Sequence, residues 1–221
     1  NHAIQELNVF VPMKIQRIMH ISENELVFNV RSQKEKHNLL ISTHSVHNRI
    51  QFTQRELVAA SVPSSFVMLL RKHLDSAIIT EISQINLDRV VKISIQKRDD
   101  LGDIHIYNLY VELMGKYANV ILVDDHQKIV DALKRIPPFE NNKRTIQSGA
   151  DYEVPKDRDK QNPFELKTIN LSDNLTQSID GISPLLEKEI RYRIENNQSF
   201  VEIMQEIKQS NKLFHLLPLD D

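Results

Sequence analysis

The sequence predicts an α+β protein, in which an antiparallel β-sandwich precedes a small helical region. Short apolar segments with alternating side chains, separated by polar turns, recur through the first 155 residues. After residue 163 the apolar residues return every three or four positions, which is typical of helices. Between them, residues 151–163 are polar, contain two prolines and show no periodicity, which indicates a linker.

Nine β-strands are predicted in the first region, because each segment alternates apolar and polar side chains and is bounded by turn-forming residues. The polar segment 32–37 is predicted to be a hairpin loop. The predicted strands are Met13–Ile21, Glu25–Arg31, Leu39–Ser42, Arg49–Thr53, Ala77–Ile82, Arg89–Ile95, Ile104–Leu113, Asn119–Val123 and Ile129–Leu133.

Two helices are predicted among these strands. One covers residues 1–8, and the other covers 61–74, where Pro63 and Ser64 supply a start signal. Arg71 and Lys72 lie in the last turns of that second helix, where cations favour the helix dipole. The helices predicted after the linker are Leu171–Ile179, Pro184–Ile194 and Phe200–Ile207, and the segment Phe214–Leu219 is predicted to be extended.

The composition of the chain argues against several classes of protein. Of the 221 residues 40% are hydrophobic, and no apolar run approaches the ~20 residues needed to cross a bilayer. The first residues do not have the pattern of a signal peptide. The absence of cysteine excludes disulfides and thiolate metal sites.

Charge is distributed unevenly along the chain. Residues 1–98 contain 13 Lys and Arg against 8 Asp and Glu, whereas residues 99–221 contain 15 against 22. The basic half would suit a phosphate backbone. An excess of this size is also ordinary for a protein surface, and both interpretations stay open.

The segment 112–131 has the strongest local signal, a strand-turn-strand-turn-strand meander with a turn at Gly115. Glu112, Lys116 and Asn119 surround this glycine, where a main chain without a side chain can approach a partner closely. The requirements of folding explain the meander, but they explain less well why charged side chains gather around its first turn. Met114 belongs to the same turn.

Two further sites have both a structural and a functional interpretation. Asp88 and Arg89 would point to opposite faces of a strand, and local evidence favours a structural interpretation, a turn aspartate beside a surface arginine whose stem lies on apolar surface. Gly181 permits a tight turn between two predicted helices, Ser183 is suited to cap the second, and Pro184 to be its first residue. Exposed amides at such a start bind phosphate, although a well-capped connection alone explains the pattern.

Metal and hydrolytic chemistry are not indicated. His37, His44 and His47 lie in predicted loops without a diagnostic ligand spacing. The sequence contains no Walker loop, GxGxxG, GxSxG or HExxH pattern. We expect no cofactor and no enzyme activity.

The segments together resemble the NFACT family, in the order in which that family has them and over nearly all 221 residues. They are Pro63–Phe66 with Leu70–Lys72, Gln84–Arg89, Glu112–Lys116 with Asn119, Ile129–Lys134, Arg144–Gly149 with Tyr152–Pro155, and Gly181–Leu186. Each segment alone is weak evidence for the family, but the combination of all of them in this order is specific.

The resemblance implies a layout. Residues 1–160 would be the NFACT N-terminal domain, similar to the N-terminal β-sandwich of formamidopyrimidine-DNA glycosylases, and residues 161–221 a partial helix-hairpin-helix domain. The family's coiled coil and C-terminal RNA-binding domain would follow in a longer protein. Base excision is rejected, because the chain shows Asn1-His2 where those glycosylases have proline and glutamate.

The resemblance also implies ribosome-associated quality control in the cytoplasm. Family members bind a large ribosomal subunit obstructed by peptidyl-tRNA, recruit charged tRNA, and support C-terminal tailing, with alanyl-tRNA in bacteria. Asp88 and Arg89 match the family's tRNA-handling pair. Further candidates for RNA contacts are Arg71, Lys72, Gly181 and Ser183, together with Gly115 and the four residues around it, Glu112, Met114, Lys116 and Asn119.

One departure from the family pattern concerns Glu187, where relatives often have a small residue. A carboxylate there suits the helix dipole but would repel a phosphate docked at the same turn. The alternative function is that of an adhesin that binds fibronectin at the cell surface after non-standard export. Exposed edge strands would then recruit an extended partner strand.

Overall fold

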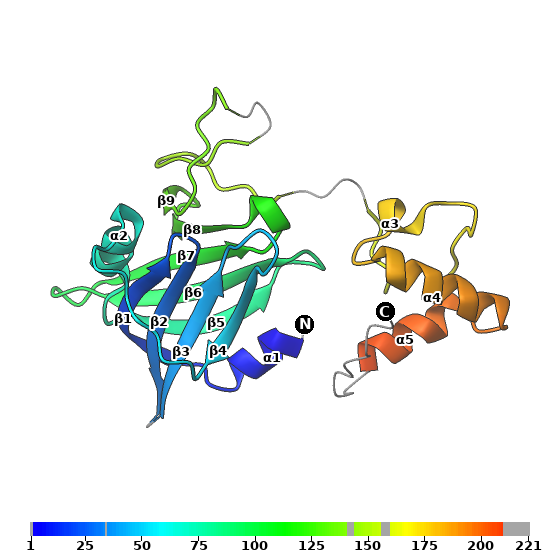
Figure 1. Ribbon diagram of the computed structural model, residues 1–221, viewed down its shortest axis with the longest axis horizontal. Coiled ribbons are helices and arrows are strands. Elements are labelled where there is room, and N and C mark those ends of the chain that lie inside the picture. Colours follow the sequence, from blue (N-terminus) through cyan, green and yellow to red (C-terminus); the bar gives the residue numbers. More distant parts are fainter. Residues whose placement is uncertain (1, 34, 141–143, 156–159, 210–221) are drawn as a thin grey trace. The chain divides into compact units, whose positions relative to one another are not determined.

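The computed structural model describes residues 2–33, 35–140, 144–155 and 160–209 (Figure 1). The chain divides into two compact units, residues 1–155 and 156–221, and each is described by itself. The sequence placed this boundary near residue 160, within the same polar segment. No helix in the described part of the chain is long and apolar enough to span a membrane.

A nine-stranded antiparallel sheet forms the first unit, in the order β4-β3-β2-β1-β5-β6-β7-β8-β9 (Figure 1). Each strand corresponds to a predicted one, with ends that differ by a few residues. The strands are β1 (Met13–Ser22), β2 (Glu25–Ser32), β3 (Glu35–Ser42), β4 (Arg49–Thr53), β5 (Ile78–Gln84), β6 (Val90–Arg98), β7 (Ile104–Glu112), β8 (Asn119–Asp124) and β9 (Ile129–Ala132).

The strands form one continuous sheet, whereas the sequence predicted the two sheets of a sandwich. Strand β1 joins β5 through only two pairs of residues, one of which is Met13 with Ile79. Both halves of the sheet still supply one core, in which Leu39 of β3 and Leu122 of β8 belong to the same buried cluster. Alternation of side chains requires only a covered face, and one sheet bent onto itself provides that as well as two sheets do.

The predicted hairpin loop at residues 32–37 is wrong. Strand β2 continues to Ser32 and β3 begins at Glu35, so that His37 is paired with Val30 inside the ladder. Ladder hydrogen bonds join main-chain groups, and the polarity of the side chains does not prevent them from forming.

Two α-helices accompany the sheet in the described residues of the first unit. Helix α1 (His2–Asn8) buries Ile4 and Leu7, and α2 (Ser65–Leu74) buries a stripe that includes Leu70. The Ser64 hydroxyl accepts a hydrogen bond from the Val67 amide at 3.3 Å, which confirms the predicted start signal. In Figure 1, α2 lies at the left of the sheet.

In the described residues 160–209, the second unit has the helices α3 (Leu175–Ser178), α4 (Pro184–Glu195) and α5 (Phe200–Gln209) around a small apolar core. Helix α3 is a single turn and shorter than predicted, because the Asn174 side chain caps it by accepting from the Gln177 amide. The segment predicted to be extended, 214–219, lies outside the described residues.

Candidate nucleic-acid interface

The Asp88–Arg89 pair lies in the turn that joins β5 to β6. Strand β6 begins at Val90, and the Ile85 amide donates to the Val90 carbonyl across the turn at 2.9 Å. The Gln84 side chain donates to the Asp88 carbonyl at 2.9 Å. The predicted alternation of faces therefore does not apply. Asp88 is half-buried, and Arg89 is exposed.

The link between β7 and β8 is hydrogen-bonded to this turn. The Leu113 amide donates to the Arg89 carbonyl at 2.8 Å, and Glu112 is paired with Val90 in the ladder. The sheet thus brings together the two segments that the sequence singled out separately. We call the β5–β6 turn and the β7–β8 link together the turn surface.

The β7–β8 link contains a short 3-10 helix, η1 (Gly115–Tyr117), that begins in the left-handed region, with a φ of 55° at Gly115. A Cβ atom at this position would lie 3.6 Å from the Ser45 carbonyl oxygen, so the β3–β4 loop lies directly against the link. Lys116 and Tyr117 are exposed, with the Lys116 ammonium 5.0 Å from the centre of the Tyr117 ring.

Glu112 is fully buried and is paired with Arg144, to which the sequence analysis gave no role. Arg144 Nη1 donates to Glu112 Oε2 at 2.8 Å, and Nη2 donates to Oε1 at 2.5 Å. The Tyr152 hydroxyl donates to Oε1 at 3.0 Å, and Arg144 also donates to the Glu153 carbonyl at 2.8 Å. Segment 144–153 is therefore fastened to the end of β7. We call Glu112, Arg144 and Tyr152 the Glu112 cluster.

The charges of the Glu112 cluster compensate one another. Burial raises the pKa of Tyr152, and the neighbouring Glu112 carboxylate raises it further. Burial alone would lower the pKa of Arg144, but the hydrogen bonds to Glu112 and the charge of its carboxylate raise this pKa above its ordinary value. The hydroxyl therefore keeps its proton and the guanidinium its charge at neutral pH. Removing one partner of such a buried pair typically costs about 3–5 kcal/mol.

Asn119 and Met114 hold the β7–β8 link from beneath. The buried Asn119 side chain donates to the Lys134 carbonyl at 2.8 Å and accepts from the Lys134 amide at 2.9 Å. The Lys134 ammonium donates to the Thr43 carbonyl at 3.3 Å, and burial lowers the pKa of Lys134. Met114 is half-buried against a second core cluster. The cation that the link exposes is Lys116.

Arg71 and Lys72 do not belong to the turn surface. The end of α2 lies beside the last residues of β6, where the Lys97 ammonium donates to the Asp75 carbonyl. The turn surface is at the other end of β6, roughly 25 Å away at about 3.3 Å per residue. The Arg71 Nε donates to the Ile18 carbonyl at 2.7 Å, on the edge of β1.

The glycine turn between α3 and α4 has the predicted caps. Gly181 has a φ of 72°, and the Ser183 hydroxyl accepts from the Leu186 amide at 3.2 Å. Pro184 is the first residue of α4. This turn lies in the second unit, and the structure does not place it relative to the turn surface.

The Glu187 side chain serves a neighbouring helix. Its carboxylate accepts from the amides of Leu175 and Thr176 at 3.4 and 3.3 Å, at the start of α3, and pairs with Arg191 at 2.5 Å. The hydrogen bonds from Arg191, followed by those from the two amides, lower the pKa of Glu187. Glu187 thus lies in the first turn of α4, as its position in the sequence indicated, and its carboxylate also caps the start of α3.

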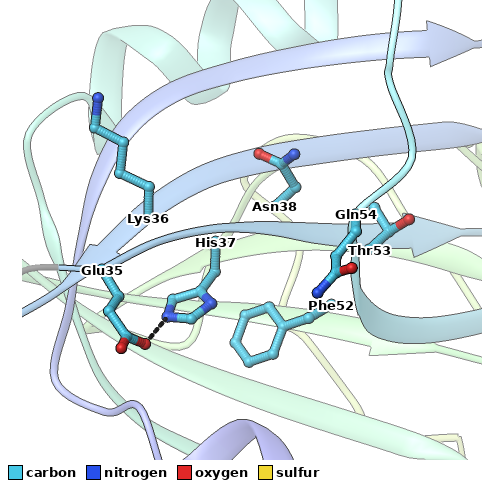
Figure 2. Close-up of a pocket in the computed structure, with 7 residues that line it drawn as sticks. All are labelled: Glu35, Lys36, His37, Asn38, Phe52, Thr53 and Gln54. Carbon is cyan, nitrogen blue, oxygen red and sulfur yellow. Dashed lines mark ion pairs between the residues drawn. The ribbon is translucent and has the colours of Figure 1, made fainter.

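The three histidines lie in two separate places. The His37 ring packs against Phe10, with ring centres 4.3 Å apart, whereas His44 and His47 stack on each other at 5.4 Å. A hollow of about 650 Å³ opens beside His37 between β3 and β4 (Figure 2), where its Nε2 lies 3.6 Å from the Glu35 carboxylate. The described residues hold no group of three or more side chains suited to a metal ion.

Sequence reasoning missed Arg144 and Tyr152, the two partners of Glu112. Both lie in segments that carry the family resemblance, but the chain between β9 and the linker has no periodicity, so no contact with Glu112 was predicted for either residue. The signal available was Glu112 itself, because an acid at a strand end next to a buried face requires a cation or donors. That requirement does not say which of the basic residues meets it.

A family model described as NFACT N-terminal and middle domains matches residues 1–217. The Streptococcus suis protein "Rqc2 homolog RqcH" is 36% identical over 221 residues, which cover 93% of this chain and 40% of that protein. The protein of the same name from Bacillus subtilis is 34% identical over 192 residues, covering 81% and 34%. The chain thus spans two fifths or less of the length of these relatives.

Solved structures are similar over most of the chain. The N-terminal part of the fibronectin/fibrinogen-binding protein from Streptococcus suis has a TM-score of 0.86 and 34% identity, covering 95% of this chain and 82% of that one. The fibrinogen binding protein from Staphylococcus aureus has a TM-score of 0.80 and 29% identity, covering 93% and 79%. Relatives with this architecture therefore have names from two functional classes.

Proposed function

The chain belongs to the NFACT family, whose relatives include the human ribosome quality control complex subunit NEMF, and on that premise we propose that its turn surface binds tRNA. The observation that carries the proposal is the hydrogen bond from the Leu113 amide to the Arg89 carbonyl, which joins the matched Asp-Arg pair to the Gly115 link. Two motifs far apart in the sequence thus form one exposed surface.

Each part of the turn surface has a distinct role in the proposal. Arg89 and Lys116 are exposed cations suited to phosphate oxygens. The Asp88 carboxylate accepts hydrogen bonds from base amino groups or ribose hydroxyls of unpaired nucleotides. Gly115 lets the RNA approach the main chain. Glu112, Met114 and Asn119 act from beneath, as positioning residues.

The wider function is that of a quality control factor at the large ribosomal subunit. In this proposal the longer protein recognises a subunit obstructed by peptidyl-tRNA and recruits alanyl-tRNA for alanine tailing, in the cytoplasm. Peptide-bond formation belongs to the ribosome, and this chain positions tRNA without catalysing a reaction. Gly181 and Ser183 offer a second RNA contact, since the Glu187 carboxylate is engaged by α3 and Arg191.

Binding of fibronectin is the alternative function. It is supported by the name of the Streptococcus suis structure and by the position of β4 at one end of the sheet order, where strand addition takes place in other proteins. Salt separates the two proposals. RNA binding weakens steeply as salt rises, whereas main-chain pairing does not.

The test is the affinity of this chain for deacylated tRNA and alanyl-tRNA across a salt series. The Asp88→Ala/Arg89→Ala variant is expected to lose at least tenfold in affinity while its circular dichroism stays unchanged. The matched control is Arg98→Ala/Asp100→Ala, an exposed pair in another hairpin of the same sheet, which should bind as the parent does. Equal affinity of the two variants would refute the assignment of Asp88 and Arg89.

A further inference from the structure

Three cations lie directly opposite one another on adjacent strands of the first unit. Lys14 of β1 is paired with Arg31 of β2, and Arg31 is paired with Lys36 of β3. Residues opposite each other in a ladder point to the same face of the sheet, with about 4.8 Å between strands. All three side chains are exposed. The sheet therefore carries a row of positive charge across three strands.

This row is unfavourable for folding. Like charges directly opposite in a sheet destabilise it. Within the described part of the chain, none of the three cations takes part in an ion pair. The nearest acid in sequence, Glu35, points to the other side of β3 together with His37, as Figure 2 shows, while Lys36 points away from them. A bound anion from outside the protein would offset the repulsion among these three positive charges.

The positive charge continues toward α2. Arg17 is paired with Asn29, two residues from Arg31 on the same strand, and is therefore on the same face, one row further along. Arg17 lines a groove of about 510 Å³ together with Arg71 and Lys72, and one carboxylate, Asp75, lines this groove as well. The six cations Lys14, Arg17, Arg31, Lys36, Arg71 and Lys72 are called the basic face below.

We propose that the basic face is a second RNA-binding surface, which holds the phosphate backbone of a double-stranded RNA segment. The inference rests on the proposed function in taking RNA as the polyanion. Cations at fixed intervals on a rigid sheet suit repeated phosphates. The row beside them is polar, with the Asn29 amide donating to Asn38 at 2.5 Å, and it offers side-chain groups to ribose hydroxyls. Base-specific contacts are not required for this binding.

The experiment compares two triple variants of the whole chain in binding a plain RNA duplex without loops. Lys14→Gln/Arg31→Gln/Lys36→Gln removes the row. Its control, Lys167→Gln/Arg98→Gln/Lys188→Gln, removes the same charge from three exposed, scattered positions. The row variant should lose about tenfold or more in affinity at low salt, and the slope of log affinity against log salt should fall by about 2 to 3.

Thermal unfolding separates a binding role from a structural one. Because the row is self-repelling, its removal should raise the unfolding midpoint by about 1 to 4 °C. A lower unfolding midpoint in the row variant would mean that the three cations stabilise the fold. Equal losses of affinity in the row variant and its control would mean that only the net charge of the protein matters for binding. Stronger binding of the parent to phosphatidylserine vesicles than to the duplex would assign the face to membranes instead.

The duplex result and the tRNA-site result are independent. The Asp88→Ala/Arg89→Ala variant should bind the plain duplex as the parent does, because its substitutions leave the basic face unchanged. If that variant keeps its affinity for tRNA while the row variant loses the duplex, the proposed tRNA site fails and the basic face stands. The reverse pattern overturns the basic face alone.

Discussion

Two glutamates near glycine turns illustrate how similar sequence signals acquire different roles. Glu112 precedes Gly115, and its carboxylate is 1% exposed and held by Arg144. Glu187 follows Gly181, and its carboxylate is 16% exposed and held by Arg191 one turn along the same helix. The first pair joins segments far apart in sequence, and the second is local.

Burial decides what each pair does for the molecule. Charges removed from water require compensation, so the Glu112 cluster fixes the position of the end of β7 and of everything hydrogen-bonded to it. A pair between neighbouring turns of one helix, only half-buried, contributes less to stability, and salt partly screens it. A turn supported by the first kind of pair is a better scaffold for a recognition surface, because its geometry is set before a ligand arrives.

The largest effect is expected from breaking the buried pair. Arg144→Met leaves the Glu112 carboxylate buried without its cation, and should lower the free energy of unfolding by about 3–5 kcal/mol. Urea denaturation followed by circular dichroism measures this loss. The double variant Glu112→Gln/Arg144→Met should recover part of it, because no buried charge is left. A loss below about 1 kcal/mol in the single variant would contradict a buried, structural pair.

A smaller effect is expected from Tyr152→Phe, which removes a donor to the buried carboxylate and should cost about 1–3 kcal/mol. The pKa of Tyr152 is raised in the folded state, so its contribution to stability is present below pH ~10 and is lost as the pH rises beyond that value, where the unfolded chain releases the proton first. The free energy of unfolding should therefore fall less steeply with rising pH for the variant than for the parent. Denaturation curves recorded between about pH 9 and 11, a range that spans the ordinary tyrosine pKa of about 10, measure this difference. Parallel curves for parent and variant would exclude this linkage.

Gly115→Ala should cost about 1–2 kcal/mol through backbone conformation alone. The φ of 55° is unfavourable for alanine, whereas the added Cβ would meet the Ser45 carbonyl oxygen only at an ordinary 3.6 Å. Thermal unfolding measures the cost, and Lys116→Ala beside it serves as the control with little effect. A loss several times larger would indicate a clash that the structure does not contain.

The smallest effect is expected from Glu187→Gln. The amide oxygen can still accept from the amides of α3, and the pair with Arg191 is half-buried and local to one helix. The unfolding midpoint should change little at low salt and less at high salt, as differential scanning calorimetry would show. Global unfolding of the variant would show that this local pair contributes as much to stability as the Glu112–Arg144 pair.

Much of the fold was accessible from sequence because its signals are local. Leu26, Phe28 and Val30 alternate and form β2, and Ser64 begins α2 where its capping chemistry indicated. The bend of one sheet onto itself was not accessible, because it depends on how few residues join β1 to β5. The length of α3 was also not predicted correctly, because the helix begins only after its cap at Asn174, although the helical spacing of apolar residues starts earlier.

The candidate site was accessible only in pieces. The turn at Asp88 and the link at Gly115 were each singled out, but only the sheet register places them side by side. The cation row of the basic face was equally hidden, because Lys14, Arg31 and Lys36 become neighbours only through the register of three strands. Long-range pairing, rather than local pattern, assembles both surfaces.

The most direct test of the central claim is amide hydrogen exchange with and without bound tRNA. If the turn surface binds tRNA, exchange should slow in segments 85–90 and 113–118 together, because one hydrogen-bonded surface is covered. Segment 99–103, the hairpin turn between β6 and β7 in the same unit, provides an internal reference that should not change, because it belongs to neither proposed RNA surface. Protection confined to the second unit, with no change in either segment of the turn surface, would contradict the account.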